Sequence, residues 1–255
     1  MQNRYAGDVG DFGKFSLLRS LFTEPEYCLG VVWYKYPDES HNGDGRHIDY
    51  LENPEYKQCD QKLVQGLSQV VTGERSISHL EKLNLLPSNT VYYSSTLDFH
   101  TIYTTQRKAD ITARRNQRNK WIDNAVVATV TCNVVFLDPD NGLEIQSIPN
   151  IHQMYSGKYA YYSEVRSLLN NKKACVIYHH LNRNNSHETQ IKFRAKELKE
   201  KISIPGTVFA LRFRPYSPRV FFIYSTSNET EAIRQKINQF LSSSCSLGWD
   251  TYYEL

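Results

Sequence analysis

A cluster of carboxylates and one amide follows an apolar segment in the middle of the chain. Residues 134–137 are apolar and are followed by Asp138-Pro139-Asp140-Asn141-Gly142. The apolar run predicts a buried strand, and the proline and glycine predict a short, stiff turn at its C-terminal end. Because α/β sheets bind ligands at that end, Asp138, Asp140 and Asn141 are candidate catalytic residues. An ordinary strand-to-loop turn is the alternative, since Asp-Pro and Asn-Gly are common in turns.

A second candidate cluster lies near the N-terminus. Residues 3–14 contain three glycines, Asp8, Asp11 and Lys14, and they precede a helix predicted over residues 15–21. Dense glycines allow a ligand to approach the backbone, and N–H groups at a helix start favour anions. We therefore include Lys14, Asp11 and Gly7 among the candidate site residues. The P-loop spacing is absent, and a flexible loop capped by Asp11 is the alternative.

A glycine-rich loop follows the first predicted strand, residues 27–34. The loop spans residues 35–47 and contains Asp38 and the sequence Gly43-Asp44-Gly45. In a doubly wound sheet this loop is the expected cofactor loop, so these four residues are candidate cofactor ligands. The third glycine and the immediate helix of the dinucleotide fingerprint are missing, which leaves a surface loop as the alternative.

The carboxylates in these loops also allow a metal site. Mg²⁺ prefers several oxygen ligands, and Asp8, Asp11, Asp138 and Asp140 would supply them if the two clusters meet. The adjacent His179 and His180 end another predicted strand, residues 174–179, and must project to opposite sides of it. They are therefore not expected to bind one metal together. One of them is a candidate for a place near the turn at residues 138–142, and a histidine with a purely structural role is the alternative.

Composition bounds the remaining possibilities. The chain has 255 residues, a net charge of +3 and five scattered cysteines, which indicates one α/β domain with reduced core thiols. No charged-then-apolar leader and no apolar run of about 18 residues occurs, so we expect a cytoplasmic protein without a membrane partner. The predicted helix 106–121 carries six Lys or Arg residues and is either a contact for nucleic-acid phosphates or a solvated face. Oligomeric state is left open.

The order of the predicted elements defines a fold class. Helices over residues 58–71 and 77–86, a strand over 91–95 and the basic helix predict a helical insertion at 58–121. The strands 207–213 and 219–225 are separated by only five residues, Arg214 to Pro218, so they must form an antiparallel hairpin. We predict an α/β fold with a Rossmann-like, mostly parallel sheet that ends in this hairpin.

This ending resembles that of class I S-adenosylmethionine-dependent methyltransferases. The chain resembles the large-subunit ribosomal RNA adenine-N6 methyltransferase family in Ala6, Gly7, Asp11 and Lys14 of an AGxxxDxxK motif and in Asp138-Pro139. It is also similar to a group of uncharacterised bacterial proteins with the motifs GDxGDxxK, WYxxPDE, NGDGRH and DPDNG. The resemblance implies S-adenosylmethionine as cofactor, a nucleic-acid acceptor, and Lys14 and Asp138 in the active site.

The chain departs from the adenine-N6 family after Asp138-Pro139. That family has a second proline followed by an aromatic residue, which stacks on the flipped base, whereas Asp140 and Asn141 stand here. Three hypotheses follow. The first is a methyltransferase-like enzyme acting on nucleic acid or a nucleotide-like substrate; the second is a Mg²⁺-dependent nuclease or phosphodiesterase; the third is a catalytically inactive nucleic-acid-binding or regulatory protein of the same fold.

Overall fold

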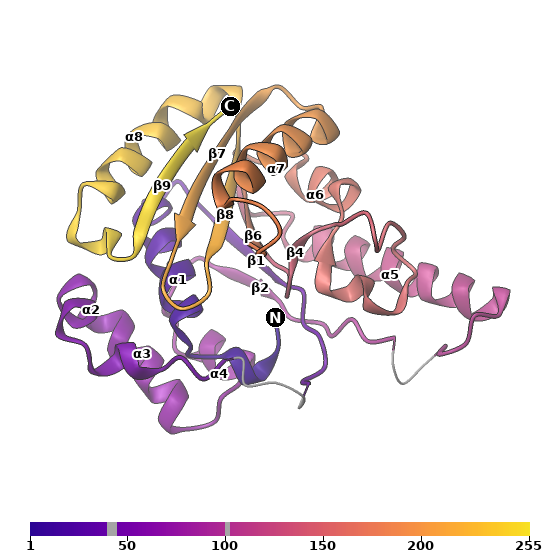
Figure 1. Cartoon of the computed structure of the whole chain (residues 1–255), viewed down its shortest axis with the longest axis horizontal. Coiled ribbons are helices and arrows are strands. Elements are labelled where there is room, and N and C mark those ends of the chain that lie inside the picture. Colours follow the sequence, from indigo (N-terminus) through magenta and orange to yellow (C-terminus); the bar gives the residue numbers. More distant parts are fainter. Residues whose placement is uncertain (40–44, 100–102) are drawn as a thin grey trace.

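A single mixed sheet organises the part of the chain that the computed structural model describes, residues 1–39, 45–99 and 103–255 (Figure 1). Its strands, from one edge to the other, are β2 (Val91–Tyr93), β1 (Leu29–Trp33), β3 (Val134–Asp138), β6 (Ala174–His180), β8 (Arg219–Thr226), β7 (Gly206–Phe213) and β9 (Trp249–Glu254). The pairs β2–β1, β1–β3 and β3–β6 are parallel, and the pairs involving β8 and β9 are antiparallel. The prediction of an α/β fold with a mostly parallel sheet is confirmed.

The closing hairpin is also confirmed. β7 and β8 pair from Gly206↔Thr226 to Phe213↔Arg219, and β8 lies between β6 and β7 in the sheet. Because β8 is antiparallel to its neighbours, its first residue lies at the edge where the parallel strands end. His180, at the end of β6, is therefore paired with Arg219, at the start of β8.

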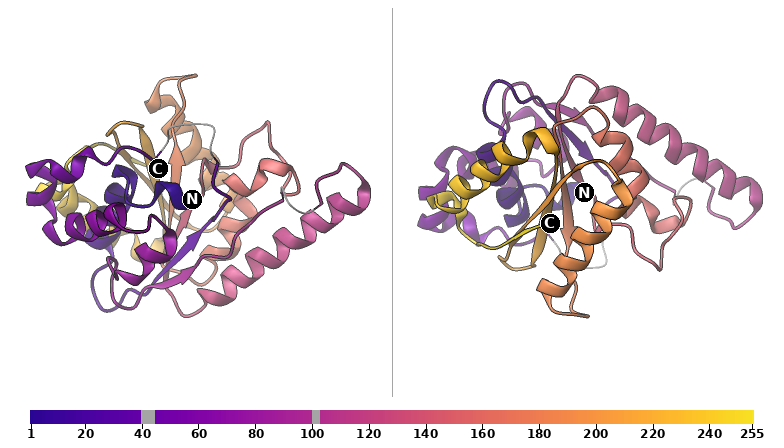
Figure 2. Two further views of the ribbon diagram at one scale, coloured as in Figure 1. Left: turned by 90° about the horizontal axis from the view of Figure 1, so that it is seen from below. Right: turned by 90° about the horizontal axis from the view of Figure 1, so that it is seen from above.

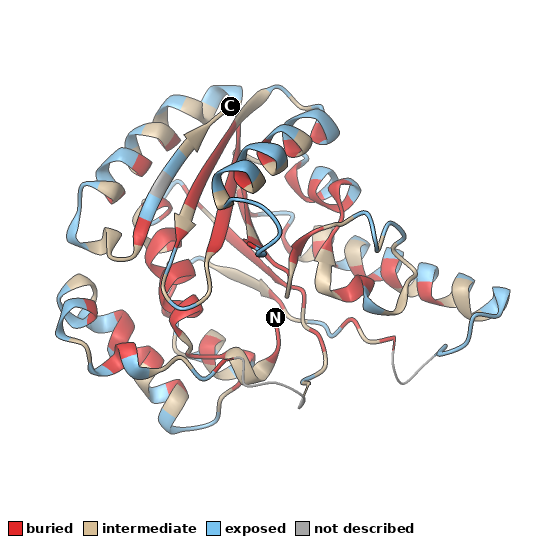
Figure 3. Cartoon of the chain, in the orientation of Figure 1, coloured by how far each residue is buried: buried red, intermediate tan, exposed pale blue. Residues whose placement is uncertain are grey.

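Helices cover both faces of the sheet (Figure 2). One face carries α1 (Val9–Leu21), α2 (Pro54–Cys59), α3 (Gln61–Thr72), α4 (Ile77–Lys82) and α8 (Thr230–Leu241). The other carries α5 (Lys108–Ala128), α6 (Tyr162–Leu169) and α7 (His187–Ile202). Alternate residues of each strand enter opposite cores, as Val134 and Val135 of β3 do, and this explains why the central strands are apolar throughout. Figure 3 shows the buried residues concentrated between the layers.

The first helix begins earlier than the sequence predicts. α1 starts at Val9, and the side chain of Asp8, not that of Asp11, caps it by accepting hydrogen bonds from the backbone N–H groups of Gly10 and Asp11. The alternative of a flexible loop capped by Asp11 is therefore wrong. The glycines serve close packing, because a Cβ atom at Gly13 would lie 2.7 Å from the ring of Phe213.

The region 58–121 divides between two structural roles. Helices α2 to α4 connect β1 to β2 on one face, whereas β2 is an edge strand of the main sheet and α5 packs on the other face through Trp121 and Ala125. α5 runs seven residues past the predicted end, and its first turns extend away from the sheet (Figure 2). The C-terminal residues form β9, which pairs with β7.

Among the helices that the structure describes, none combines the length and the apolar character that a membrane span requires.

Candidate functional site

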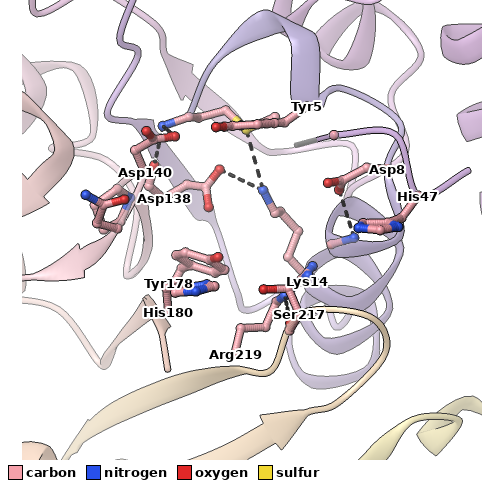
Figure 4. A pocket seen from close by; sticks show the side chains of 15 residues that line it. Tyr5, Asp8, Lys14, His47, Asp138, Asp140, Tyr178, His180, Ser217 and Arg219 are labelled. Atoms are coloured by element: carbon pink, nitrogen blue, oxygen red, sulfur yellow. Dashed lines mark hydrogen bonds and ion pairs between the residues drawn. The ribbon is translucent and has the colours of Figure 1, made fainter. Parts of the chain in front are cut away.

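A pocket of about 280 Å³ lies where β3 and β6 end and β8 begins. It is lined by α1, the turn after β3, the end of β6 and the hairpin connection, and Figure 4 shows its side chains. The lining residues are Met1, Tyr5, Asp8, Gly10, Lys14, Gly45, His47, Asp138, Pro139, Asp140, Asn141, Tyr178, His180, Ser217 and Arg219. The two clusters predicted from the sequence therefore meet in one pocket.

Lys14 joins these clusters at the centre. Its Nζ atom lies 2.9 Å from Oδ1 of Asp11, one turn earlier in α1, and 2.7 Å from Oδ2 of Asp138, at the end of β3. All three side chains are buried. The other oxygen of Asp11 accepts a hydrogen bond of 2.7 Å from the backbone N–H of Gly7. The contact fixes Asp138 in orientation and leaves its Oδ1 atom without a hydrogen-bond partner among the described residues.

Two buried carboxylates share this one ammonium group, and the contact affects the pKa values of Asp11 and Lys14. Burial raises the pKa of Asp11 to about 6, although Lys14 opposes the shift. Burial opposes protonation of Lys14, but Asp11 and Asp138 together raise its pKa above the ordinary value. Lys14 therefore stays protonated at neutral pH. It can donate a hydrogen bond to Asp138 but cannot act as a base.

A buried histidine positions the turn after β3. The backbone N–H of Leu143 donates to Nδ1 of His179 at 3.0 Å, and burial lowers the pKa of this histidine to about 3, which keeps it a neutral acceptor. Gly142 has φ +114°, and a Cβ atom there would lie 2.2 Å from the same Nδ1 atom. His180 points to the other side of the strand and lines the pocket (Figure 4). The predicted divergence of the two histidines is confirmed.

Asp140 and Asn141 differ in their surroundings. Asp140 accepts a hydrogen bond of 2.9 Å from Gln2 Nε2 and lies 3.5 Å from Lys158 Nζ. The backbone N–H of Asn141 donates to the carbonyl of Lys158 at 2.9 Å. The Asn141 side chain lines the pocket, so it can contact a ligand directly.

The α-amine of Met1 occupies the crevice between β1 and β3. It donates to the carbonyl oxygens of Tyr34 at 2.9 Å and Asp138 at 3.3 Å, and it lies 3.8 Å from Oδ1 of Asp140. The Met1 sulfur lies 3.8 Å from Lys14 Nζ. The chain leaves β1 toward β2 and leaves β3 toward β6, so this crevice is the topological switch point at which open α/β sheets bind ligands.

The predicted cofactor residues are only partly assembled. Gly45, with φ +81°, lines the pocket, whereas Gly43 and Asp44 lie outside the described residues. Asp38 accepts a hydrogen bond of 3.3 Å from the backbone N–H of Arg4 and is not part of the pocket lining. Gly7 does not line the pocket either, because it packs against α3. A Cβ atom at Gly7 would lie 2.7 Å from the Val71 side chain. The placement of Asp38 and Gly7 at the cofactor is not supported by this geometry.

The carboxylates proposed as metal ligands already have protein partners. Asp8 caps α1, Asp11 and Asp138 contact Lys14, and Asp140 contacts Gln2 and Lys158. In the described ranges no group of three or more His, Cys, Asp or Glu side chains is placed to hold a metal ion. An ammonium group thus lies between the two carboxylates that a metal would have to bridge.

Several pocket residues were not predicted from the sequence. Tyr178 comes from the end of β6, and Ser217 and Arg219 come from the hairpin. Burial raises the pKa of Tyr178 to about 12, so it is a neutral hydroxyl at the pocket wall. The antiparallel hairpin was the available signal, because it places the first residue of its second strand at the ligand-binding edge of the sheet.

The basic helix presents only part of its charge to solvent. Arg118 is buried against Glu164, with Nε to Oε1 at 2.6 Å, and Arg114 is buried against the carbonyl oxygens of Tyr103, Thr105 and His152. These two arginines fasten α5 to the protein and cannot reach phosphates. The exposed charges on and just before the helix are Arg107, Lys108, Arg115 and Lys120.

Comparison with protein-family models and with curated protein sequences finds no match for the chain.

Proposed function

We propose that this protein is an S-adenosylmethionine-dependent methyltransferase-like enzyme that acts on nucleic acid or a nucleotide-like substrate. The observation that carries the proposal is the buried Lys14–Asp138 pair at the C-terminal end of a central parallel strand. The strand order supports it, because an antiparallel strand inserted before the last parallel one, as β8 is, resembles the ending of the class I methyltransferase fold. The catalytic lysine and Asp-Pro implied by the resemblance are in contact.

The crevice at the switch point suits the methionine part of the donor. The α-amine of Met1 is held there by the carbonyl oxygens of Tyr34 and Asp138 and by the carboxylate of Asp140. S-adenosylmethionine carries the same α-amine, and the same acceptors would hold it once Met1 moves aside. Bound there, the donor would supply an activated methyl group next to Asp138.

The acceptor side of the pocket is formed by Asp138, Asn141 and Tyr178. Asp138 Oδ1 would accept a hydrogen bond from the amine or hydroxyl of the acceptor, while Lys14 holds the other oxygen of the side chain in place. Tyr178 offers an aromatic ring that the motif itself lacks. The rate enhancement would come from holding the acceptor in line with the donor, an effect of up to about 7–11 kcal/mol in favourable cases.

The test is calorimetric titration with S-adenosylmethionine, followed by transfer of a radiolabelled methyl group to RNA and to DNA. The wild type should bind the donor, Asp140→Asn should weaken donor binding, and Asp138→Asn should bind the donor but abolish transfer. Asp123→Asn, on the exposed surface of α5, is the matched control and should behave as the wild type. Absence of donor binding at millimolar concentration would overturn the proposal.

The exposed charges of α5 suit a nucleic-acid partner. Each phosphate contact that is removed should lower the slope of log affinity against log salt by about one. Replacing Lys108, Arg115 and Lys120 by Gln should therefore reduce both the affinity for single-stranded RNA and this slope. Unchanged binding would exclude α5 as the contact surface.

A further inference from the structure

Arg219 is a largely buried cation that makes no ion pair with the described residues. The residue is only 5% exposed and belongs to the wall of the pocket opposite Asp138 and Asp140 (Figure 4). Its Nε atom donates to the carbonyl oxygen of Ser217 at 2.9 Å. In the described part of the chain, its two terminal nitrogens have no hydrogen bond, and no carboxylate lies within 4.0 Å of them.

Asp8 also lines this pocket, and its Oδ1 atom is already engaged. Asp8 Oδ1 accepts hydrogen bonds from the backbone N–H groups of Gly10 at 2.8 Å and Asp11 at 3.2 Å, as the cap of α1. The terminal nitrogens of Arg219 line the pocket without an anion of the described residues beside them, so a ligand that brings an anionic group into the pocket would supply the partner that this guanidinium group lacks.

The fold makes room for this arginine. A Cβ atom at Gly10 would lie 2.1 Å from Arg219 Nη1, so only glycine at this position lets the guanidinium lie against the first turn of α1. At the same wall, His47 stacks on the exposed Tyr216, with ring centroids 4.3 Å apart and planes inclined by 23°. The guanidinium group thus lies in a pocket whose lining includes the His47 ring, on which Tyr216 stacks from outside the lining.

We propose that Arg219 forms a phosphate-binding subsite of this pocket, which takes the phosphate of a nucleotide or of a nucleic-acid backbone. The planar guanidinium fork matches a phosphate with two parallel hydrogen bonds, and the neighbouring rings suit an attached base. This deepens the proposed function by naming the anionic group of the acceptor, and it rests on that function for the nucleotide character of the ligand.

The test compares adenosine with adenosine 5′-monophosphate and with a short single-stranded oligoribonucleotide, by calorimetric titration. The wild type should bind the phosphorylated ligands more tightly than adenosine, and Arg219→Gln should lose between about tenfold and a hundredfold of that affinity while adenosine binding stays the same. Arg214→Gln, on the same hairpin but exposed, should match the wild type. Preference for the oligoribonucleotide over the mononucleotide would assign the phosphate to a nucleic-acid backbone, and the reverse to a free nucleotide.

Thermal unfolding with inorganic phosphate gives a second readout that needs no nucleotide. Phosphate should raise the melting temperature of the wild type but not that of Arg219→Gln, and without phosphate the variant should melt no lower than the wild type, because it lacks the buried unpaired charge. Arg219→Lys keeps the charge without the fork and should show an intermediate response.

Equal binding of adenosine and its monophosphate, or full phosphate binding by folded Arg219→Gln, would overturn the subsite. The methyltransferase proposal is tested by a different result, the binding of the donor. If the donor does not bind but phosphate binding depends on Arg219, the methyltransferase proposal is lost and the subsite stands.

Discussion

The contact between Lys14 and two buried carboxylates makes this residue important for stability as well as for the site. Replacing Lys14 by Met removes the only cation within reach of both Asp11 and Asp138 among the described residues. We expect a loss of about 3–5 kcal/mol in the free energy of unfolding, since a broken buried ion pair leaves uncompensated charge. Urea denaturation measures this loss, and Lys62→Met, on an exposed position of α3, should change it by less than about 0.5 kcal/mol.

Asp11 gives the stability a defined pH dependence. Its pKa is about 6 in the folded protein against an ordinary 3.8, so the folded state binds this proton more tightly than the unfolded chain. The contribution of Asp11 is therefore fully present below pH 3.8 and is lost as the pH rises through 6. Relative to Asp11→Asn, which does not titrate, the wild type should lose about 2 kcal/mol between pH 4 and pH 7. Parallel stability curves for the two proteins would contradict the raised pKa.

At the scale of single elements, α5 is anchored by charge rather than by an apolar face. The Arg118 guanidinium donates to both oxygens of Glu164 and to the carbonyl oxygens of Ser156 and Tyr159. The low apolar content of α5 would suggest a segment that is only appended to the core, but the helix is held to the protein by the buried Arg118–Glu164 pair.

Arg118→Met should destabilise the protein by about 3–5 kcal/mol, because Glu164 is left buried without its partner. That loss corresponds to a melting temperature lower by roughly 6–20 °C for a chain of this size. Arg115→Met, three residues earlier and exposed on the same helix, should shift the melting temperature by no more than about 2 °C. Similar shifts for both variants would show that the buried pair does not anchor α5.

The parallel strands, the hairpin and the turn after β3 could be predicted from local pattern, because apolar runs and turn residues act over a few positions. The Lys14–Asp138 contact could be anticipated only through the family resemblance, since the two residues are 124 positions apart. Two features needed the tertiary structure. The start of α1 was missed because glycines argue against a helix unless a neighbouring strand packs on them. The burial of Arg114 and Arg118 was missed because their partners lie outside the helix.

At the scale of the whole molecule, one sheet connects two cores. Every parallel strand contributes side chains to both helical layers, so neither core can be lost without disrupting the strands of the other. We expect residues 1–255 to unfold in a single transition, as the single domain predicted from the chain length would. Tryptophan fluorescence can follow the unfolding of each core, because Trp121 of α5 lies in one core and Trp33 and Trp249 lie in the other. Variants that retain one tryptophan should give unfolding midpoints that coincide with one another and with circular dichroism. A separate midpoint for Trp121 would show that the layers unfold independently.

The close approach of α1 to β8 also has a consequence for how sequences of this kind can diverge. A Cβ atom at position 10 would lie 2.1 Å from the guanidinium group of Arg219 and 2.9 Å from Oδ1 of Asp8, so a side chain at position 10 requires a shorter residue at 219 and a shift of the Asp8 side chain. Substitutions at the two positions should therefore be correlated among homologues, with alanine or serine at 10 accompanied by a shorter residue at 219. A lineage that made this paired change would have given up the buried cation, and its acceptor would be expected to lack a phosphate at that place.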